Sequence, residues 1–146
     1  LGAGRMADAA RAGWVAIALG AGFMAVMAAV LLLAAGVIAR GFLDAADPRA
    51  AEVAALGATL LAVAGVFQLA DGVQVVAAGA LRGLADTRVP MVFAAIGYWV
   101  LGLPAGLALA WWAGLGPAGI WMGLAIGLTV VAGLMLARWR RLSAVR

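Results

Sequence analysis

The sequence predicts an all-α integral membrane protein with four transmembrane helices. Hydrophobic residues make up 68% of the 146 residues and charged residues only 11%, whereas soluble domains are about half apolar and about a quarter charged. The few charged residues also divide the chain into long apolar blocks. Because a helix rises about 1.5 Å per residue, about 20 residues cross the ~30 Å hydrocarbon core. Four blocks are long enough, and we predict helices at 12–39, 53–81, 89–113 and 115–137.

The first two helices are joined by a short polar connection. The first block lies between Arg11 and Arg40 without an internal charge, and its length leaves room for tilt or for an extension into the headgroup layer. In the connection that follows, Asp47-Pro48 suits a turn or a helix start. The second block contains a single ionisable residue, Asp71, near its middle.

The third helix contains two prolines with different expected effects. Pro90 lies in the first turn, where a missing N–H costs little, and Asp86 or Thr87 can cap that end. Pro104 lies inside the span, and we expect it to kink the helix, with the freed carbonyl bonded by a neighbouring helix or water. A minimal turn leads to the fourth helix, after which residues 138–146 are expected to form a polar tail.

The placement of arginine predicts the orientation in the membrane. Only Arg40 and Arg49 lie on one side of the four-span arrangement; the other side carries Arg5, Arg11, Arg82, Arg88, Arg138, Arg140, Arg141 and Arg146. Arginine-rich segments stay in the cytoplasm, so we expect the C-terminus and the connection between the second and third helices on that side. Tryptophans near span ends are typical interfacial anchors, which here are Trp111, Trp112, Trp121 and Trp139.

The sequence also excludes several classes of function. It contains no cysteine and no histidine, and its only serine is Ser143 in the tail. Serine–histidine hydrolysis, thiol chemistry and Cys/His metal sites therefore lack the necessary residues. No phosphate-binding G-x-x-x-x-G-K-[ST] motif is present, and the arginines form no stripe that would bind nucleic acid. We predict no enzyme activity, no cofactor and no nucleic-acid partner.

Glycines recur at helical spacing on two of the predicted helices. The second helix has one every seven residues, at Gly65, Gly72 and Gly79, and the fourth has one every four residues, at Gly119, Gly123 and Gly127. In lipid, small residues at such spacing allow helix backbones to approach closely. We therefore interpret both sets as packing faces.

Asp71 is the strongest candidate for a functional site. An Asp at the centre of a bilayer costs about 2.5–3.5 kcal/mol, so it normally faces a cavity, a partner or an ion path. Gln68 and Gln74 lie three residues away on either side, which predicts one polar stripe on the helix. Ionised Asp71 would bind a monovalent cation such as Na⁺ or a cationic solute, and in its protonated form it would carry H⁺.

Each of these residues also has a structural interpretation. Asp71, Gln68 and Gln74 would alternatively form an interhelical hydrogen-bond cluster of the kind found in membrane bundles, an interpretation that applies more to the two glutamines than to Asp71. Tyr98 on the third helix is a further candidate to line the site, although a buried tyrosine hydroxyl usually makes a hydrogen bond that serves packing.

Three segments together resemble the multidrug and toxic compound extrusion (MATE) transporters, most of all the NorM-like branch. They are FQLADGVQVVAAGALRGLADTRVPM at 67–91, GYWVLGLP at 97–104 and GPAGIWMGLAIGL at 116–128. The resemblance implies twelve helices in two six-helix lobes, with residues 1–146 as the C-terminal fragment that supplies the last four helices of the C-terminal lobe. Residues 1–11 then correspond to the end of the loop before the ninth helix.

The resemblance also implies a function. Proteins of this family are secondary active antiporters that export organic cations and drugs in exchange for Na⁺ or H⁺, and the NorM-like branch lies in the bacterial inner membrane as multi-pass proteins. Asp71 matches an aspartate of the tenth helix that forms part of the cation site, whose glutamate companion lies on an earlier helix outside this chain. The expected partners are the lipid bilayer, organic cation substrates and the missing N-terminal lobe.

Two alternatives remain at this point. A flippase for lipid-linked precursors would have the same architecture and would be separated by its substrate. A small four-helix membrane scaffold or oligomerising subunit would use Asp71 to hold helices together rather than to couple ion flow.

Overall fold

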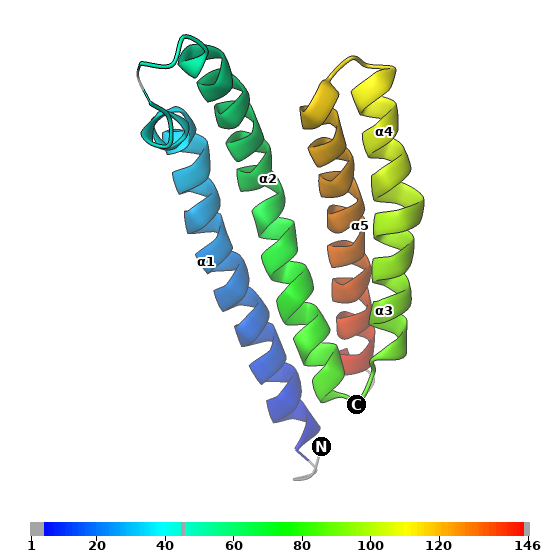
Figure 1. Ribbon diagram of the computed structural model, residues 1–146. Helices are drawn as coiled ribbons and strands as arrows, with labels where there is room; N and C mark the ends of the chain where they lie inside the picture. Colours follow the sequence, from blue (N-terminus) through cyan, green and yellow to red (C-terminus); the bar gives the residue numbers. More distant parts are fainter. Residues whose placement is uncertain (1–4, 45, 145–146) are drawn as a thin grey trace.

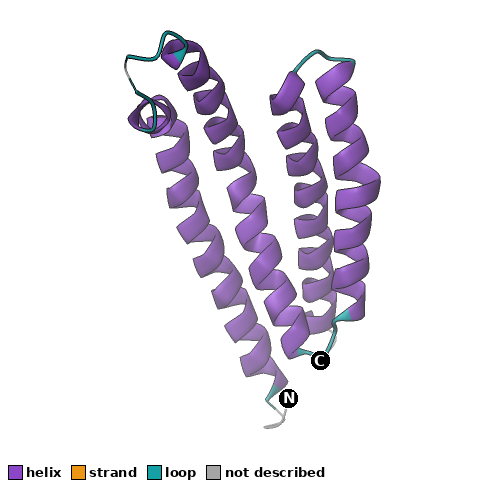
Figure 2. Cartoon of the chain, viewed as in Figure 1, coloured by secondary structure: helices purple, strands orange, loops and turns teal. Residues whose placement is uncertain are grey.

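The computed structural model describes residues 5–44 and 46–144, and these residues form long antiparallel helices without a strand (Figures 1 and 2). The elements are α1 (Met6–Gly41), α2 (Ala50–Gly83), α3 (Arg88–Ala95), the π-helix η1 (Ile96–Gly102), α4 (Leu103–Trp111) and α5 (Gly116–Ala144). Because α3, η1 and α4 follow one another directly, the described residues contain four helical spans long and apolar enough to cross a membrane. This confirms the predicted fold class.

The helices extend beyond the predicted apolar spans. α1 begins at Met6 rather than near residue 12, and α5 continues to Ala144, so most of the segment expected as a tail is helical. Arginine is a good helix former, and a helix therefore has no reason to end where the hydrocarbon layer does. Residues 1–4 and 145–146, which were expected on the cytoplasmic side, lie outside the described residues.

The distortion expected from Pro104 takes the form of a π-helical segment. η1 lies directly before the proline, and the N–H of Leu103 bonds to the carbonyl of Tyr98, five residues back. A proline ring clashes with the carbonyl four residues before it in an α-helix. The wider π-helical turn places the distortion ahead of Pro104, and such segments occur frequently at functional sites.

The two polar connections differ in how well they were predicted. The turn at Asp47-Pro48 is confirmed, since the Asp47 carboxylate accepts a hydrogen bond from the backbone N–H two residues later at 2.8 Å. The side-chain cap expected for the third helix is wrong. Thr87 is the N-cap residue but its side chain makes no capping hydrogen bond, and the Asp86 carboxylate instead accepts a 2.8 Å hydrogen bond from Nε of Arg138.

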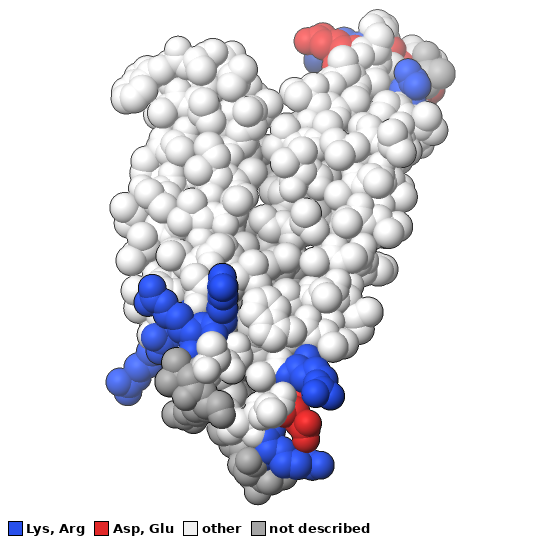
Figure 3. Space-filling view, turned by 180° about the vertical axis from the view of Figure 1, so that it is seen from behind, with Lys and Arg blue, Asp and Glu red and all other residues white. Residues whose placement is uncertain are grey.

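The helices form two hairpins, α1–α2 and α3–α5, which meet where α2 packs against α5 (Figure 1). We call the end with the α2–α3 connection the arginine end and the end with the α1–α2 and α4–α5 connections the loop end. The hairpins lie close together at the arginine end and diverge toward the loop end (Figure 1). In the space-filling view, charged side chains gather at these two ends with an uncharged band between them (Figure 3).

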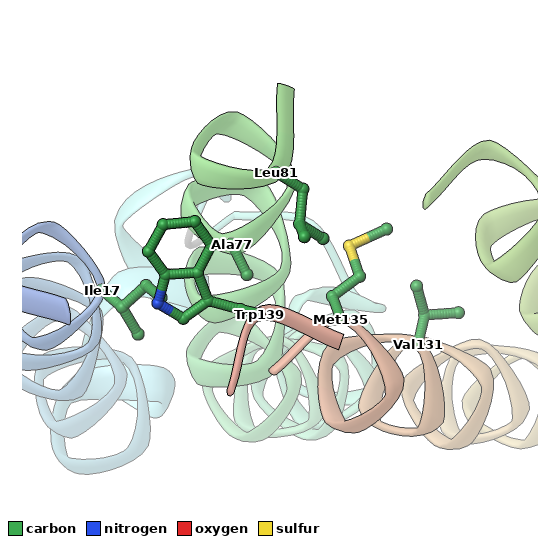
Figure 4. Packing of buried hydrophobic residues seen from close by; sticks show 6 residues of the cluster. All are labelled: Ile17, Ala77, Leu81, Val131, Met135 and Trp139. Atoms are coloured by element: carbon green, nitrogen blue, oxygen red, sulfur yellow. The ribbon is translucent and has the colours of Figure 1, made fainter. Parts of the chain in front are cut away.

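A compact cluster of buried side chains joins the hairpins at the arginine end (Figure 4). Its members are Ile17, Ala77, Leu81, Val131, Met135 and Trp139. Trp139 is only 2% exposed, so its predicted role as an interfacial anchor is wrong. The reason is tertiary, since the indole lies against Gly13 of α1, where an added Cβ would overlap it. Trp111 and Trp112 remain exposed, as interfacial tryptophans would be.

The glycines of α5 pack directly on the backbone of the third span. A Cβ added at Gly123 would overlap backbone atoms of Gly106, and a Cβ added at Gly127 would overlap the carbonyl oxygen of Gly97. At Gly119 the neighbours are backbone atoms of residues 109 and 110. The predicted packing face on the last helix is confirmed, and we call this contact the glycine seam.

The glycines of α2 pack on α1 instead, and one of them does not pack at all. A Cβ added at Gly65 would come within 3.2 Å of the carbonyl oxygen of Ala28, and one at Gly72 would overlap the side chain of Met24. Gly79 has no neighbouring atom within 4 Å of such a Cβ. The predicted face is confirmed at two positions and wrong at the third.

Candidate functional site

The predicted polar stripe of α2 is divided between two directions. Gln68 points to α1, where its Nε2 lies 3.5 Å from Sδ of Met24, while Asp71 and Gln74 face the other hairpin. A helix turns by about 100° per residue, so steps of three residues rotate the direction by about 60° each. Gln68 and Gln74 therefore point about 120° apart, and α2, which lies between α1 and α5, separates them.

A direct hydrogen bond joins Gln74 to the third span. The hydroxyl of Tyr98 in η1 donates to Oε1 of Gln74 at 2.9 Å, and the pair is partly buried. This bond connects the two hairpins through side chains. Tyr98 therefore makes the packing-related hydrogen bond that a buried tyrosine usually makes, and it also lines the cavity that contains Asp71.

Asp71 lies in a cavity of about 200 Å³ between the two hairpins. Aromatic and leucine side chains provide the rest of its lining, namely Phe67, Tyr98, Trp121, Leu124 and Leu128. The rings of Phe67 and Trp121 are stacked, with centroids 5.6 Å apart and planes at 24°. Asp71 itself is half-buried. Among the described residues its carboxylate has neither a hydrogen bond nor an ion pair, although other carboxylates of the chain do.

A second cavity, of about 320 Å³, extends from Gln74 toward the arginine end. It lies between α2 and α3 over Met135 of α5, and its polar lining residues are Gln74, Arg82 and Thr87. The Arg82 side chain folds back along α2, with Nε 3.3 Å from the carbonyl oxygen of Ala78. The Tyr98–Gln74 hydrogen bond thus lies where the two cavities adjoin, because Tyr98 lines one and Gln74 lines the other.

A hollow larger than these two cavities lies elsewhere. It has a volume of about 550 Å³ at the loop end, between α1 and α2, and is lined mainly by alanine with Arg40 and Asp47 at its rim. None of the four polar candidates lines it. We place the site at the Asp71 cavity because, unlike this hollow, it contains a carboxylate near the middle of a membrane-spanning helix, where a charge is costly.

The donor set around Asp71 is suited to a cation. Asp71 supplies a carboxylate and Tyr98 a hydroxyl oxygen to the cavity, and the amide oxygen of Gln74 is hydrogen-bonded to that hydroxyl. Aromatic faces attract organic cations. In the described part of the chain, no three His, Cys, Asp or Glu side chains gather as a metal site would require. A Na⁺ ion at Asp71 would therefore need further oxygens from main chain, water or other helices.

Four lining residues were not recognised as such from the sequence, and two of them, Phe67 and Trp121, are aromatic. Phe67 precedes Asp71 by four residues and so lies on the same helix face, a signal that was available. Trp121 was interpreted only as an interfacial anchor, yet it reaches the Asp71 cavity from α5. Nothing in the local sequence indicates this, because the contact depends on how the two hairpins are packed.

Comparisons with known proteins agree on one family. A family model described as MatE matches residues 1–108. The chain is 51% identical to the "probable multidrug resistance protein NorM" of Mesorhizobium japonicum over 140 aligned residues. The alignment covers 96% of this chain and 30% of that protein. Similar proteins in Brucella suis and Burkholderia vietnamiensis are 54% and 50% identical, covering 90% and 96% of this chain and 28% and 30% of those proteins. The chain spans about three tenths of the length of these curated relatives. No solved structure matches it.

Proposed function

Because this chain belongs to the MatE family of multidrug and toxic compound extrusion transporters, we propose that it forms part of an antiporter that exports organic cations in exchange for Na⁺ or H⁺. In this proposal the chain supplies the last four helices of a twelve-helix protein in the bacterial inner membrane. Its relatives are named as multidrug resistance proteins and are about three times as long. The lobe that precedes these helices is then the partner that completes the transport pathway.

The observation that carries the proposal is the position of Asp71. About 18 Å of helix separates it from the end of α2 at Gly83, by the rise of 1.5 Å per residue, which is close to the middle of the hydrocarbon layer. A carboxylate at that depth without an ion pair is costly. Binding a cation or a proton removes that cost, and the adjacent aromatic rings favour an organic cation in the same place.

Competition for one carboxylate would couple the two fluxes. When Asp71 holds the coupling ion, its charge is neutralised and it attracts an organic cation less; when the organic cation is bound, the coupling ion is displaced. The hydroxyl oxygen of Tyr98, which lines the same cavity, and the amide oxygen of Gln74, which is bonded to that hydroxyl, are candidate further ligands for Na⁺, whereas H⁺ needs the carboxylate alone. Alternation of access to the two sides of the membrane then converts this competition into exchange.

We also propose an orientation. The excess of arginine at one end favours a cytoplasmic location for that end by the positive-inside rule. The C-terminus and the α2–α3 connection would then be cytoplasmic, and the hairpins would diverge toward the outside.

The deciding experiment is export by Asp71→Asn in the full-length protein. We expect this variant to lose export of ethidium, a fluorescent organic cation, from proteoliposomes with an imposed gradient, while its amount in the membrane is unchanged. The matched control is Asp8→Asn, since Asp8 is an exposed carboxylate that pairs with Arg5 at the arginine end. Export by Asp71→Asn at the wild-type rate would contradict the coupling role. Imposing Na⁺ and H⁺ gradients separately identifies the ion.

The alternatives are less well supported by the geometry. A scaffold that used Asp71 to hold helices together would need a hydrogen bond from Asp71 to another helix. Among the described residues both glutamines of the stripe make such a bond and Asp71 does not. A flippase of the same architecture is separated by its substrate, since it would not export ethidium.

A further inference from the structure

We propose that the hydrogen bond between Tyr98 and Gln74 is an access gate, which separates the Asp71 cavity from the arginine end of the protein. The inference rests on the proposed function, because it assigns a role in that transport to two residues beside Asp71. An ion or water molecule that passes between the arginine end and Asp71 would first have to break the hydrogen bond between these two side chains.

The gate is placed by the two cavities that it separates. Tyr98 lines the cavity of Asp71, and Gln74 lines the cavity that continues to Arg82 and Thr87. Along α2, Gln74 lies about 4.5 Å beyond Asp71, and Arg82 lies about 12 Å further toward the arginine end. The 2.9 Å bond from Tyr98 to Gln74 therefore crosses the route between a carboxylate at mid-membrane and the end of the helix.

The two partners of the gate lie on different hairpins. Tyr98 belongs to η1, which is fixed to α5 because Gly97, beside it, packs on the backbone of Gly127. Gln74 belongs to α2, and both cavities lie between α2 and the other hairpin. A relative movement of the hairpins would break the bond, whereas a movement within the α3–α5 hairpin is prevented by the glycine seam.

The chemistry of the pair suits a closure that opens into water. While they are together, the hydroxyl donor and the amide oxygen satisfy each other in a partly buried position. When they separate, both groups bond to water equally well, so the open state leaves no polar group unsatisfied.

Asp71 has a closure of a different kind toward the loop end. The stacked rings of Phe67 and Trp121 lie one helical turn closer to that end than Asp71 does. Stacked rings exclude water without offering hydrogen bonds to it. The hydrogen-bonded closure is thus the one through which a hydrated ion passes more readily, and it lies on the arginine-end side.

The test measures water access to the Asp71 cavity in the full-length protein. Leu124→Cys places a thiol in that cavity and Ala78→Cys places one in the neighbouring cavity, each in a background without other cysteines. A membrane-impermeant cationic methanethiosulfonate is applied from the arginine end. We expect rapid modification at position 78 and slow modification at position 124.

Opening the gate should change only one of these rates. Tyr98→Phe, which keeps the ring, and Gln74→Leu should each raise the modification rate at position 124 by about fivefold. A hydrogen bond contributes about 1 kcal/mol net, and its loss shifts the equilibrium between the closed and open gate by about that factor. The rate at position 78 should stay the same. The matched control is Gln68→Leu, which makes the same substitution on α2 at a side chain that faces Met24 and lines neither cavity.

Three results would overturn the gate. They are equal rates at positions 78 and 124 in the wild type, no modification at position 78, or no increase at position 124 in either gate variant. Because thiol access is measured without transport, the proposal and the proposed function fail separately. If ethidium is exported but neither gate variant raises the modification rate at position 124, only the gate is refuted. If the modification rates behave as expected but no gradient drives export, the antiporter is refuted.

Discussion

Both hairpins are rich in glycine, but their glycines pack with different closeness on the neighbouring helix. In the α3–α5 hairpin, glycine faces glycine, so that Gly123 lies on the backbone of Gly106. In the α1–α2 hairpin, an added Cβ at Gly72 would overlap the flexible side chain of Met24, whereas one at Gly65 would come within 3.2 Å of the Ala28 carbonyl oxygen without overlapping it. Backbone against backbone leaves no atom that is free to move, whereas a methionine adapts to many shapes. The comparison indicates one hairpin that is rigid and one that can be repacked.

The difference has a place in the proposed mechanism. The rigid hairpin carries Tyr98 and Trp121, and the adaptable one carries Asp71, Gln74 and Phe67. Every contact proposed to open therefore joins the two hairpins, and none lies within the rigid one. Small residues stabilise helix pairs in lipid through close van der Waals contact, and the cavities between the hairpins lack such contact.

The largest expected effect is that of Gly123→Ala in the rigid hairpin. The new methyl group would overlap the backbone of Gly106, which cannot be relieved by a change of rotamer, so we expect destabilisation of about 3 kcal/mol or more. The measurement is the melting temperature and the monodisperse fraction of the full-length protein in detergent. Gly133→Ala on the same helix, where an added Cβ meets no atom within 4 Å, should leave both unchanged. A wild-type melting temperature for Gly123→Ala would show that the glycine seam is not rigid.

Gly72→Ala in the adaptable hairpin should have a smaller effect. Its methyl group would overlap Cγ of Met24, which a change of rotamer can move, and would lie 3.1 Å from Cβ of Met24, which has less freedom; we expect a loss of about 1–2 kcal/mol. Adding Met24→Ala to this variant should recover part of the loss, which a thermal melt of both variants would detect. If Gly72→Ala proved as damaging as Gly123→Ala, the contrast between the hairpins would be wrong. Gly79→Ala provides the control on α2, since its Cβ also meets no atom.

The smallest effect is expected where charge holds the hairpins together. Asp86 of the α2–α3 connection and Arg138 of α5 form a partly exposed ion pair at 2.8 Å, and Asp86→Asn should cost about 1 kcal/mol or less. Because salt screens such pairs, the difference from the wild type should shrink at 1 M salt. Asp8→Asn removes a longer and more exposed pair, 3.7 Å from Arg5, and should cost less still. A loss for Asp86→Asn that does not depend on salt would assign its effect to packing.

Much of the fold could be predicted from the sequence because it depends on composition and on the placement of charges. The partner of the α5 glycines could not, and the reason is geometric. Gly97 and Gly102 are five residues apart and Gly102 and Gly106 four. This spacing is irregular for an α-helix, but the wider turn of η1 between the first two brings all three to the same face of α5.

The candidate site shows the same division between local and tertiary information. Asp71 was recognisable because a lone carboxylate within a long apolar block is costly in any membrane fold. The separation of Gln68 from Gln74 depends on which helices flank α2, and the burial of Trp139 depends on a gap at Gly13, 126 positions earlier in the chain. Local spacing contains neither fact, because both arise from the packing of distant helices.

The burial of Trp139 also gives the protein an intrinsic fluorescence signal that depends on its structure. Of the six tryptophans, all within the described residues, the other five are 40% to 90% exposed. The indole N–H of Trp139 is buried and has no hydrogen-bond partner among the described atoms, so Trp139 should emit at shorter wavelength than a water-exposed tryptophan. Separation of α1 from α5 at the arginine end would admit water and shift that emission to the red. Native fluorescence would then follow the arginine end during a transport cycle, without any attached dye.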